Sequence, residues 1–163
     1  MNRWFLLAIG VLIALLGGNL AWHYAQMPAT VASHFNSAGH VDSTMHRATF
    51  AWLCMLVPLG MALLFAGIAW LLPRMPVNMI NLPHKEIWFA PENRAATLAF
   101  LRRAFSWMGL LSVAMLVAVF HLTIRANLQV PPALGAEVWV LMGLFLAALL
   151  TWIVYFLGHF LRI

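Results

Sequence analysis

Four long runs of apolar residues dominate the chain, and short polar stretches separate them. The apolar runs cover residues 4–22, 50–72, 104–124 and 138–160, and none carries a charged residue in its central part. Each is close to the length of about 20 residues that a helix needs to cross a bilayer core of about 30 Å. Backbone groups in hydrocarbon must be satisfied within their own segment, which favours helices over open strands. We therefore predict an all-α integral membrane protein, with residues 1–163 as a single four-span domain.

The first apolar run also has to be weighed as a cleavable signal peptide, because Asn2 and Arg3 precede it. Its length exceeds the about 7–15 apolar residues of a signal peptide. Bulky side chains, Trp22, His23 and Tyr24, stand where a small-residue cleavage site would be expected. We interpret this run as a retained membrane helix.

The polar positions gather in two segments, 23–49 and 73–103. In the first, Pro28 is placed to open one helical turn as its first residue. Residues 36–39, Asn-Ser-Ala-Gly, are typical of a turn, because Gly39 is free to take a positive φ. The pieces on either side, 34–35 and 40–42, are expected to lie side by side as a short hairpin.

The composition fits a protein in lipid. Hydrophobic residues make up 64% of the chain and charged residues 8%, whereas soluble domains average about 45–50% and about 25%. This balance excludes a soluble enzyme and a disordered tail. The single cysteine, Cys54, excludes an intrachain disulfide.

The net charge of +5 raises the question of a nucleic-acid partner, and the placement of the cations answers it. With the N-terminus inside, the inner segments carry Arg3, Arg74, Lys85, Arg94, Arg102, Arg103 and Arg162, and the outer ones carry Arg47 and Arg125. This is the positive-inside bias of membrane proteins. It predicts that both termini and residues 73–103 are cytoplasmic, that residues 23–49 lie outside, and that no nucleic acid is needed to explain the charge.

A pattern in the outer segment resembles a known family. The residues that carry it are Pro28, His34, Phe35, Asn36, Gly39 and Asp42. Their order resembles the domain of unknown function 1648, a short module of bacterial multispan membrane proteins that include toxin-immunity and signalling types similar to SdpI. The resemblance covers about 50 residues, from the first helix into the second. It implies a bacterial inner membrane location and an architecture more than an activity. After the aspartate, where the family often has Gly or Trp and then a basic residue, this chain reads Ser-Thr-Met-His.

Three histidines in this segment, His34, His40 and His46, suggest a metal site, with Asp42 among them. Their six-residue spacing places neighbours on different faces of a helix, or about 20 Å apart along one face of a strand. Only a folded-back loop would gather them around an ion. The favoured interpretation is that His34 bonds the loop backbone beside Asp42. Sensing of pH by this pair is a further alternative, because an imidazole titrates near neutrality.

The second polar segment contains another ordered motif. It consists of Asn81, Pro83, Lys85, Trp88, Pro91, Glu92 and Arg94, and it resembles a sequence that follows the second span in a bacterial subset of the same family. Pro91 at a first helical position, followed by Glu92, predicts a helix start. We expect the third span to begin there as a cytoplasmic interfacial helix, with Trp88 anchoring the segment before it. Alternatives are binding of anionic lipid through Lys85, Arg94, Arg102 and Arg103, and docking of a partner through Trp88.

Candidate chemistry is sparse. The acids are Asp42, Glu86, Glu92 and Glu137, divided between the two sides, and no nucleophile or phosphate-binding motif accompanies them. We therefore expect a non-enzymatic protein without a cofactor. Its outer segment would serve sensing, immunity or partner binding, with lipid, a membrane protein, an envelope toxin or a second copy of the chain as partners. The alternative is a small-solute or ion transporter, or an accessory subunit of a membrane complex.

Overall fold

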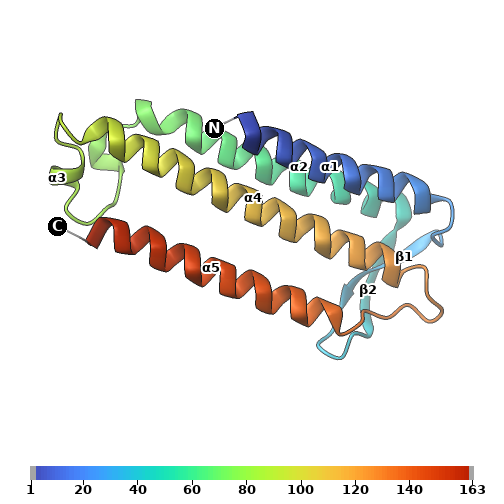
Figure 1. The fold of residues 1–163 in the computed structure, drawn as a ribbon. Helices are drawn as coiled ribbons and strands as arrows, with labels where there is room; N and C mark the ends of the chain where they lie inside the picture. The colour runs from blue at the N-terminus through green and yellow to red at the C-terminus, as the bar shows by residue number, and fades with distance from the viewer. Residues whose placement is uncertain (1–2, 162–163) are drawn as a thin grey trace.

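The computed structural model describes residues 3–161, so the predicted charge of Arg162 lies outside the described residues. Four long helices run side by side: α1 (Arg3–Tyr24), α2 (Arg47–Leu71), α4 (Arg94–Ala126) and α5 (Glu137–Leu161). A hairpin of β1 (Thr30–Phe35) and β2 (Val41–His46) projects from one end. At the other end lie two 3-10 turns, η1 (Leu72–Arg74) and η2 (Val77–Met79), and the short helix α3 (Lys85–Trp88). Both described chain ends lie on the side away from the hairpin (Figure 1).

The four predicted spans are confirmed as helices that are long and apolar enough to cross a membrane. α4 has 33 residues, which at about 1.5 Å per residue is longer than a bilayer core of about 30 Å requires. The charged residues that precede its apolar run, Arg94, Arg102 and Arg103, lie in the part of α4 next to α3. The helix start predicted at Pro91 is wrong by three residues, because residues 91–93 form a turn and α4 begins at Arg94. As expected, the helix that begins after this turn is continuous with the third span, and both belong to α4.

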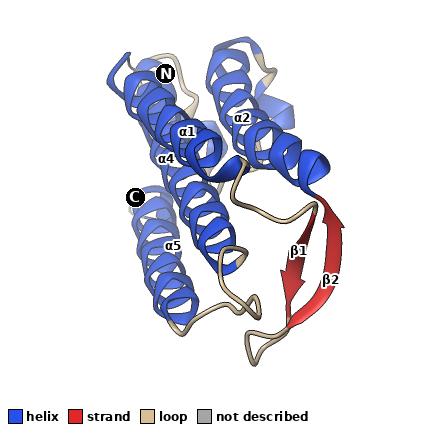
Figure 2. Ribbon diagram, turned by 90° about the vertical axis from the view of Figure 1, so that its right-hand side faces the viewer, coloured by secondary structure: helices blue, strands red, loops and turns tan. Residues whose placement is uncertain are grey.

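α4 is the centre of the bundle. It packs against α1, α2 and α5, whereas α5 packs mainly against α4 and stands apart from the other long helices (Figures 1 and 2). The approach of α4 to α2 is close at Gly109, which is buried. A Cβ atom there would lie 2.7 Å from the Cβ of Phe65. Only glycine lets the two helices come together at this point.

The predicted hairpin is present at the expected place in the chain, but its strands are longer than the predicted pieces, 34–35 and 40–42. β1 and β2 are antiparallel, from Thr30 opposite His46 to Phe35 opposite Val41, with an irregularity in the pairing around Ser33. The helical turn expected at Pro28 is wrong. The connection from α1 to β1 is irregular there, and Pro28 is exposed. The hairpin leaves the α1–α2 end of the bundle, beside the loop between α4 and α5 (Figure 2).

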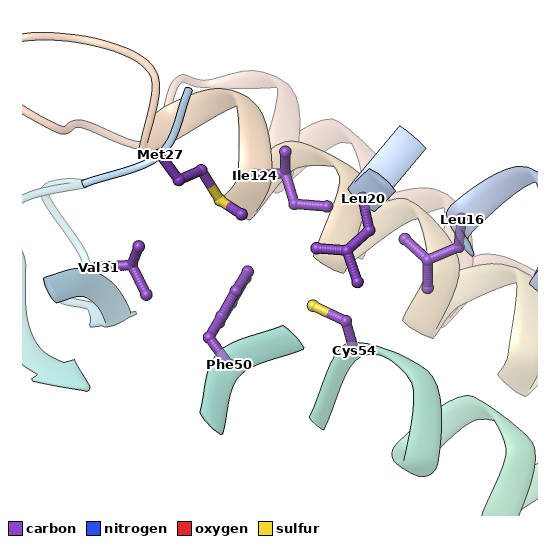
Figure 3. Packing of buried hydrophobic residues seen from close by; sticks show 7 residues of the cluster. All are labelled: Leu16, Leu20, Met27, Val31, Phe50, Cys54 and Ile124. Carbon is purple, nitrogen blue, oxygen red and sulfur yellow. The ribbon is translucent and has the colours of Figure 1, made fainter. Parts of the chain in front are cut away.

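A hydrophobic cluster joins the hairpin to the helices. Figure 3 shows its seven buried members: Leu16, Leu20, Met27, Val31, Phe50, Cys54 and Ile124. They come from α1, the connection after it, β1, α2 and α4. The base of the hairpin is thus part of the bundle core. We conclude that its position relative to the membrane helices is fixed by packing as well as by the chain connections.

Candidate functional site

The tip of the hairpin is built by Asn36 and Gly39, as the sequence predicts. The side-chain Oδ1 of Asn36 accepts hydrogen bonds from the backbone N–H groups of Ala38 (2.9 Å) and His40 (3.0 Å). The backbone N–H of Asn36 also donates to the carbonyl of His40 at 2.8 Å. Gly39 has a φ of 80°, in the left-handed region that suits glycine. Both residues therefore shape the turn.

His34 and Asp42 form an exposed pair across the two strands. The Nδ1 atom of His34 lies 2.5 Å from Oδ1 of Asp42, and the side chains are 69% and 43% exposed. Next to them, the hydroxyl of Ser33 donates to that of Ser43 at 3.4 Å. His34 lies beside Asp42 as predicted, but the imidazole pairs with this carboxylate where a bond to the loop backbone was expected. The pair is available to a molecule that approaches from solvent. Phe35, half-buried, pairs with Val41 at the end of the ladder.

The three histidines do not form a metal site. His46 instead caps α2, its Nδ1 accepting the N–H of Ala48 at 3.2 Å. His40 forms an isolated backbone bridge with Ala133 in the α4–α5 loop. Within residues 3–161, no group of three or more metal-binding side chains is placed to hold an ion. The gathered cluster that the metal hypothesis requires is not formed, because the imidazole of His34 pairs with Asp42, that of His46 caps α2, and His40 is bridged through its backbone.

Asn127, which follows the last residue of α4, holds β1 in place. Its Oδ1 accepts the N–H of Ala32 at 2.6 Å, and its Nδ2 donates to the carbonyl of Ala32 at 2.9 Å. Nδ2 also donates to the carbonyl of Thr123 at 3.0 Å. The side chain is 2% exposed. Asn127 thus provides hydrogen-bond partners for both the N–H and the carbonyl of Ala32, as a neighbouring third strand would do.

Sequence reasoning missed Asn127. Its position at the end of a long apolar helix marks it as a helix C-cap, a signal that was available. The bonded residue lies 95 positions earlier in the chain, and no local pattern identifies such a partner.

The tip of the hairpin also contacts the α4–α5 loop through its backbone. The N–H of Leu134 donates to the carbonyl of Gly39 at 3.0 Å, beside the bridge from His40 to Ala133. A Cβ atom added to Gly39 would clash with the carbonyl oxygen of Leu134. Gly39 is therefore required twice, once for its φ and once for this contact.

Arg47, the first residue of α2, ties α2 to the end of α1. Its Nη1 donates to the carbonyls of Tyr24 (3.0 Å) and Met27 (2.8 Å). Its guanidinium lies over the Tyr24 ring at 4.6 Å. A cation at the C-terminal end of a helix is favourable because the last carbonyls there lack partners. The sequence had indicated Arg47 only as an outer charge.

The motif at the opposite end is a brace between helices. The indole N–H of Trp88 donates to the carbonyl of Phe160 at 3.3 Å, and the Thr97 hydroxyl donates to the carbonyl of Trp88 at 2.7 Å. Trp88 thereby links α3 to α4 and α5. The other members are placed around it: Asn81 and Pro83 before α3, Lys85 in α3, Pro91 and Glu92 in the turn before α4, and Arg94 at the start of α4.

Comparison with known families locates the hairpin in a recognised module. A family model described as domain of unknown function (DUF1648) matches residues 5–57. The match covers nearly all of α1, the hairpin and the first part of α2, including every predicted residue of the outer segment. Neither the curated proteins nor the solved structures that were compared give a match.

Proposed function

Since the chain is a DUF1648-containing protein with four helices suited to spanning a membrane, we propose that its hairpin is a binding surface on the outer side of a bacterial inner membrane. The bound molecule would be a partner protein, in a sensing, immunity or partner-binding role without catalysis. The observation that carries the proposal is the exposed His34–Asp42 pair on a hairpin whose base is fixed.

The charge distribution supports this orientation. Away from the hairpin, the helix ends and connections carry Arg3, Arg74, Lys85, Arg94, Arg102 and Arg103. At the hairpin end stand Arg47 and Arg125, and Arg47 is bound to the carbonyls that end α1. The side with the excess of Lys and Arg is expected to be cytoplasmic.

The two edges of the hairpin differ, which favours β2 as the contact strand. β1 is held by Asn127 on its outer edge. β2 pairs with β1 and exposes the side chains of Asp42, Ser43 and Thr44. An edge strand of this kind can accept an extended segment of another protein as a further strand. The imidazole and carboxylate of the pair would select for polar or charged side chains on that segment.

Photo-crosslinking in bacterial membranes tests this binding mode. With a photoreactive residue in place of Thr44, we expect one discrete adduct with a partner protein. The adduct should weaken at least fivefold in the His34→Gln, Asp42→Asn double variant, because side-chain selection is lost while the backbone ladder remains. The same photoreactive residue at exposed Gln129, in the α4–α5 loop, is the matched control and should give no such adduct. An adduct that is equal at both positions, or that ignores the double variant, would contradict the proposal.

Transport is the second candidate, and one observation favours it. His121 of α4 and Asn19 of α1 form a polar pair at 3.3 Å inside the predicted spans, and an ionisable group at such a place is a candidate for solute or ion passage. Flux in liposomes that is abolished by His121→Leu and unaffected by the hairpin variants would favour transport over binding.

A further inference from the structure

A hollow runs along the seam between α4 and α5. Two cavities of about 440 Å³ and about 410 Å³ lie end to end and share Leu111 and Ala148. The seam is hollow because small side chains line it: Ala104, Ala114 and Ala118 from α4, and Ala148 from α5. Trp152 closes the first cavity on one side, with its indole N–H donating to the carbonyl of Ala104 at 3.0 Å.

The dimensions of this groove fit a single acyl chain. From Arg103 to Ala118 the groove follows α4 over 16 residues, a rise of about 22 Å at 1.5 Å per step. One leaflet of a bilayer core is about 15 Å deep, so the groove is long enough for an acyl chain that enters from one leaflet.

The chemistry of the groove is polar at one end only. Arg103 lies at the end nearer α3, with the hydroxyl-bearing residues Thr151 and Tyr155 opposite it on α5. Arg103 is exposed, and within residues 3–161 no acidic side chain forms an ion pair with it. Trp107 lines the same cavity and is 54% exposed, as expected of an indole at the boundary between headgroups and hydrocarbon.

We propose that this groove binds one anionic phospholipid, with an acyl chain along the α4–α5 seam and the headgroup phosphate at Arg103. A guanidinium suits a phosphate because its N–H groups can donate two parallel hydrogen bonds. The lipid would fill the space that the small residues leave, and so would join α5 to the rest of the bundle. The proposal concerns a different face from the hairpin and does not depend on what the hairpin binds.

Native mass spectrometry of the delipidated full chain in mild detergent tests the site. The chain is titrated with phosphatidylglycerol or phosphatidylcholine that carry the same acyl chains. We expect one tightly bound phosphatidylglycerol, favoured about fivefold over phosphatidylcholine by the single arginine. Arg103→Gln should remove this preference, whereas Ala148→Phe should weaken binding of both lipids by filling the junction of the two cavities.

Two matched controls make the test specific. Arg102→Gln removes the neighbouring exposed arginine, which lines a different cavity with Arg74, and should keep the preference. Leu150→Phe enlarges an exposed residue of α5 outside the groove and should keep the affinity. Where Ala148→Phe lowers the melting temperature, Ala114→Phe fills the second cavity from the α4 side instead.

Three results would overturn the proposal. One is an equal loss of preference in Arg102→Gln and Arg103→Gln, which would show diffuse attraction rather than a site. Another is unchanged lipid affinity in both groove-filling variants when each is folded. The third is a dimer of the chain that Ala148→Phe dissociates, which would make a second copy the occupant of the groove.

Discussion

Replacing Asn127 with alanine is expected to release the hairpin from the helix bundle. The substitution leaves the N–H and the carbonyl of Ala32, a residue that is 3% exposed, without their partners. Each buried backbone group that loses its hydrogen bond costs about 1–3 kcal/mol. Losing both partners costs at least about 2 kcal/mol, which corresponds to a rise of about 30-fold or more in amide hydrogen exchange. We expect that rise over residues 30–46, measured by mass spectrometry on the protein in nanodiscs.

Gln129→Ala is the matched control for this variant. Gln129 lies two residues further along and is exposed, and the structure gives its backbone N–H a bond to the carbonyl of Ala126. Its removal should leave exchange in the hairpin unchanged. Unaltered protection of β1 in Asn127→Ala would show that the hydrophobic cluster alone holds the hairpin, and the role given to Asn127 would then be wrong.

Gly39→Ala is expected to detach the tip of the hairpin from the α4–α5 loop. The left-handed conformation costs a residue with a Cβ about 1–2 kcal/mol. The new Cβ would also displace the carbonyl of Leu134 and break the hydrogen bond from Leu134 N–H to Gly39. The total is about 2–4 kcal/mol, since loss of the bond adds about 1 kcal/mol and strain the remainder. The readouts are faster exchange at the Leu134 amide and a lower melting temperature.

Two further substitutions separate the cost of the left-handed backbone at Gly39 from the loss of its contact with Leu134. Gly39→Asn tolerates the left-handed conformation better than alanine does, but it still carries a Cβ. Because the contact with Leu134 is lost in both variants, exchange at the Leu134 amide should be as fast in Gly39→Asn as in Gly39→Ala. Gly18→Ala in α1, where an added Cβ meets open space, should leave the melting temperature unchanged or slightly raised. Full protection of the Leu134 amide in Gly39→Asn would contradict the required close contact.

The membrane helices could be predicted from the sequence because their signal is local. Each span is a run of apolar residues, and the length of the run is enough to predict a membrane-spanning helix. The structure differs from these predictions only at the helix ends, as at Arg94. The packing could not be predicted in the same way. Gly109 resembles every other glycine of the chain in sequence. Its importance comes from Phe65, 44 positions earlier on another helix.

In the candidate site, too, local features could be predicted from the sequence and contacts between distant residues could not. The turn at Asn36 and Gly39 and the proximity of His34 to Asp42 follow from residues that are at most eight positions apart, so sequence reasoning reached them. Asn127 and Arg47 were missed in these roles because the bonds that tie them to β1 and to the end of α1 go to backbone groups 20 or more positions away, which leave no trace in side-chain type. The histidine cluster was wrong for the converse reason. Regular spacing in sequence did not become proximity in space.

Labelling of single cysteines in intact bacterial cells tests the central claim, that the hairpin faces outward as an accessible surface. Thr44→Cys reports on β2, Glu86→Cys reports on α3 at the opposite end, and the native chain serves as the blank because its one cysteine, Cys54, is buried. We predict that a membrane-impermeant maleimide labels position 44 in intact cells and position 86 only after the cells are opened. Labelling of position 86, but not of position 44, in intact cells would contradict the orientation and the binding role that rests on it.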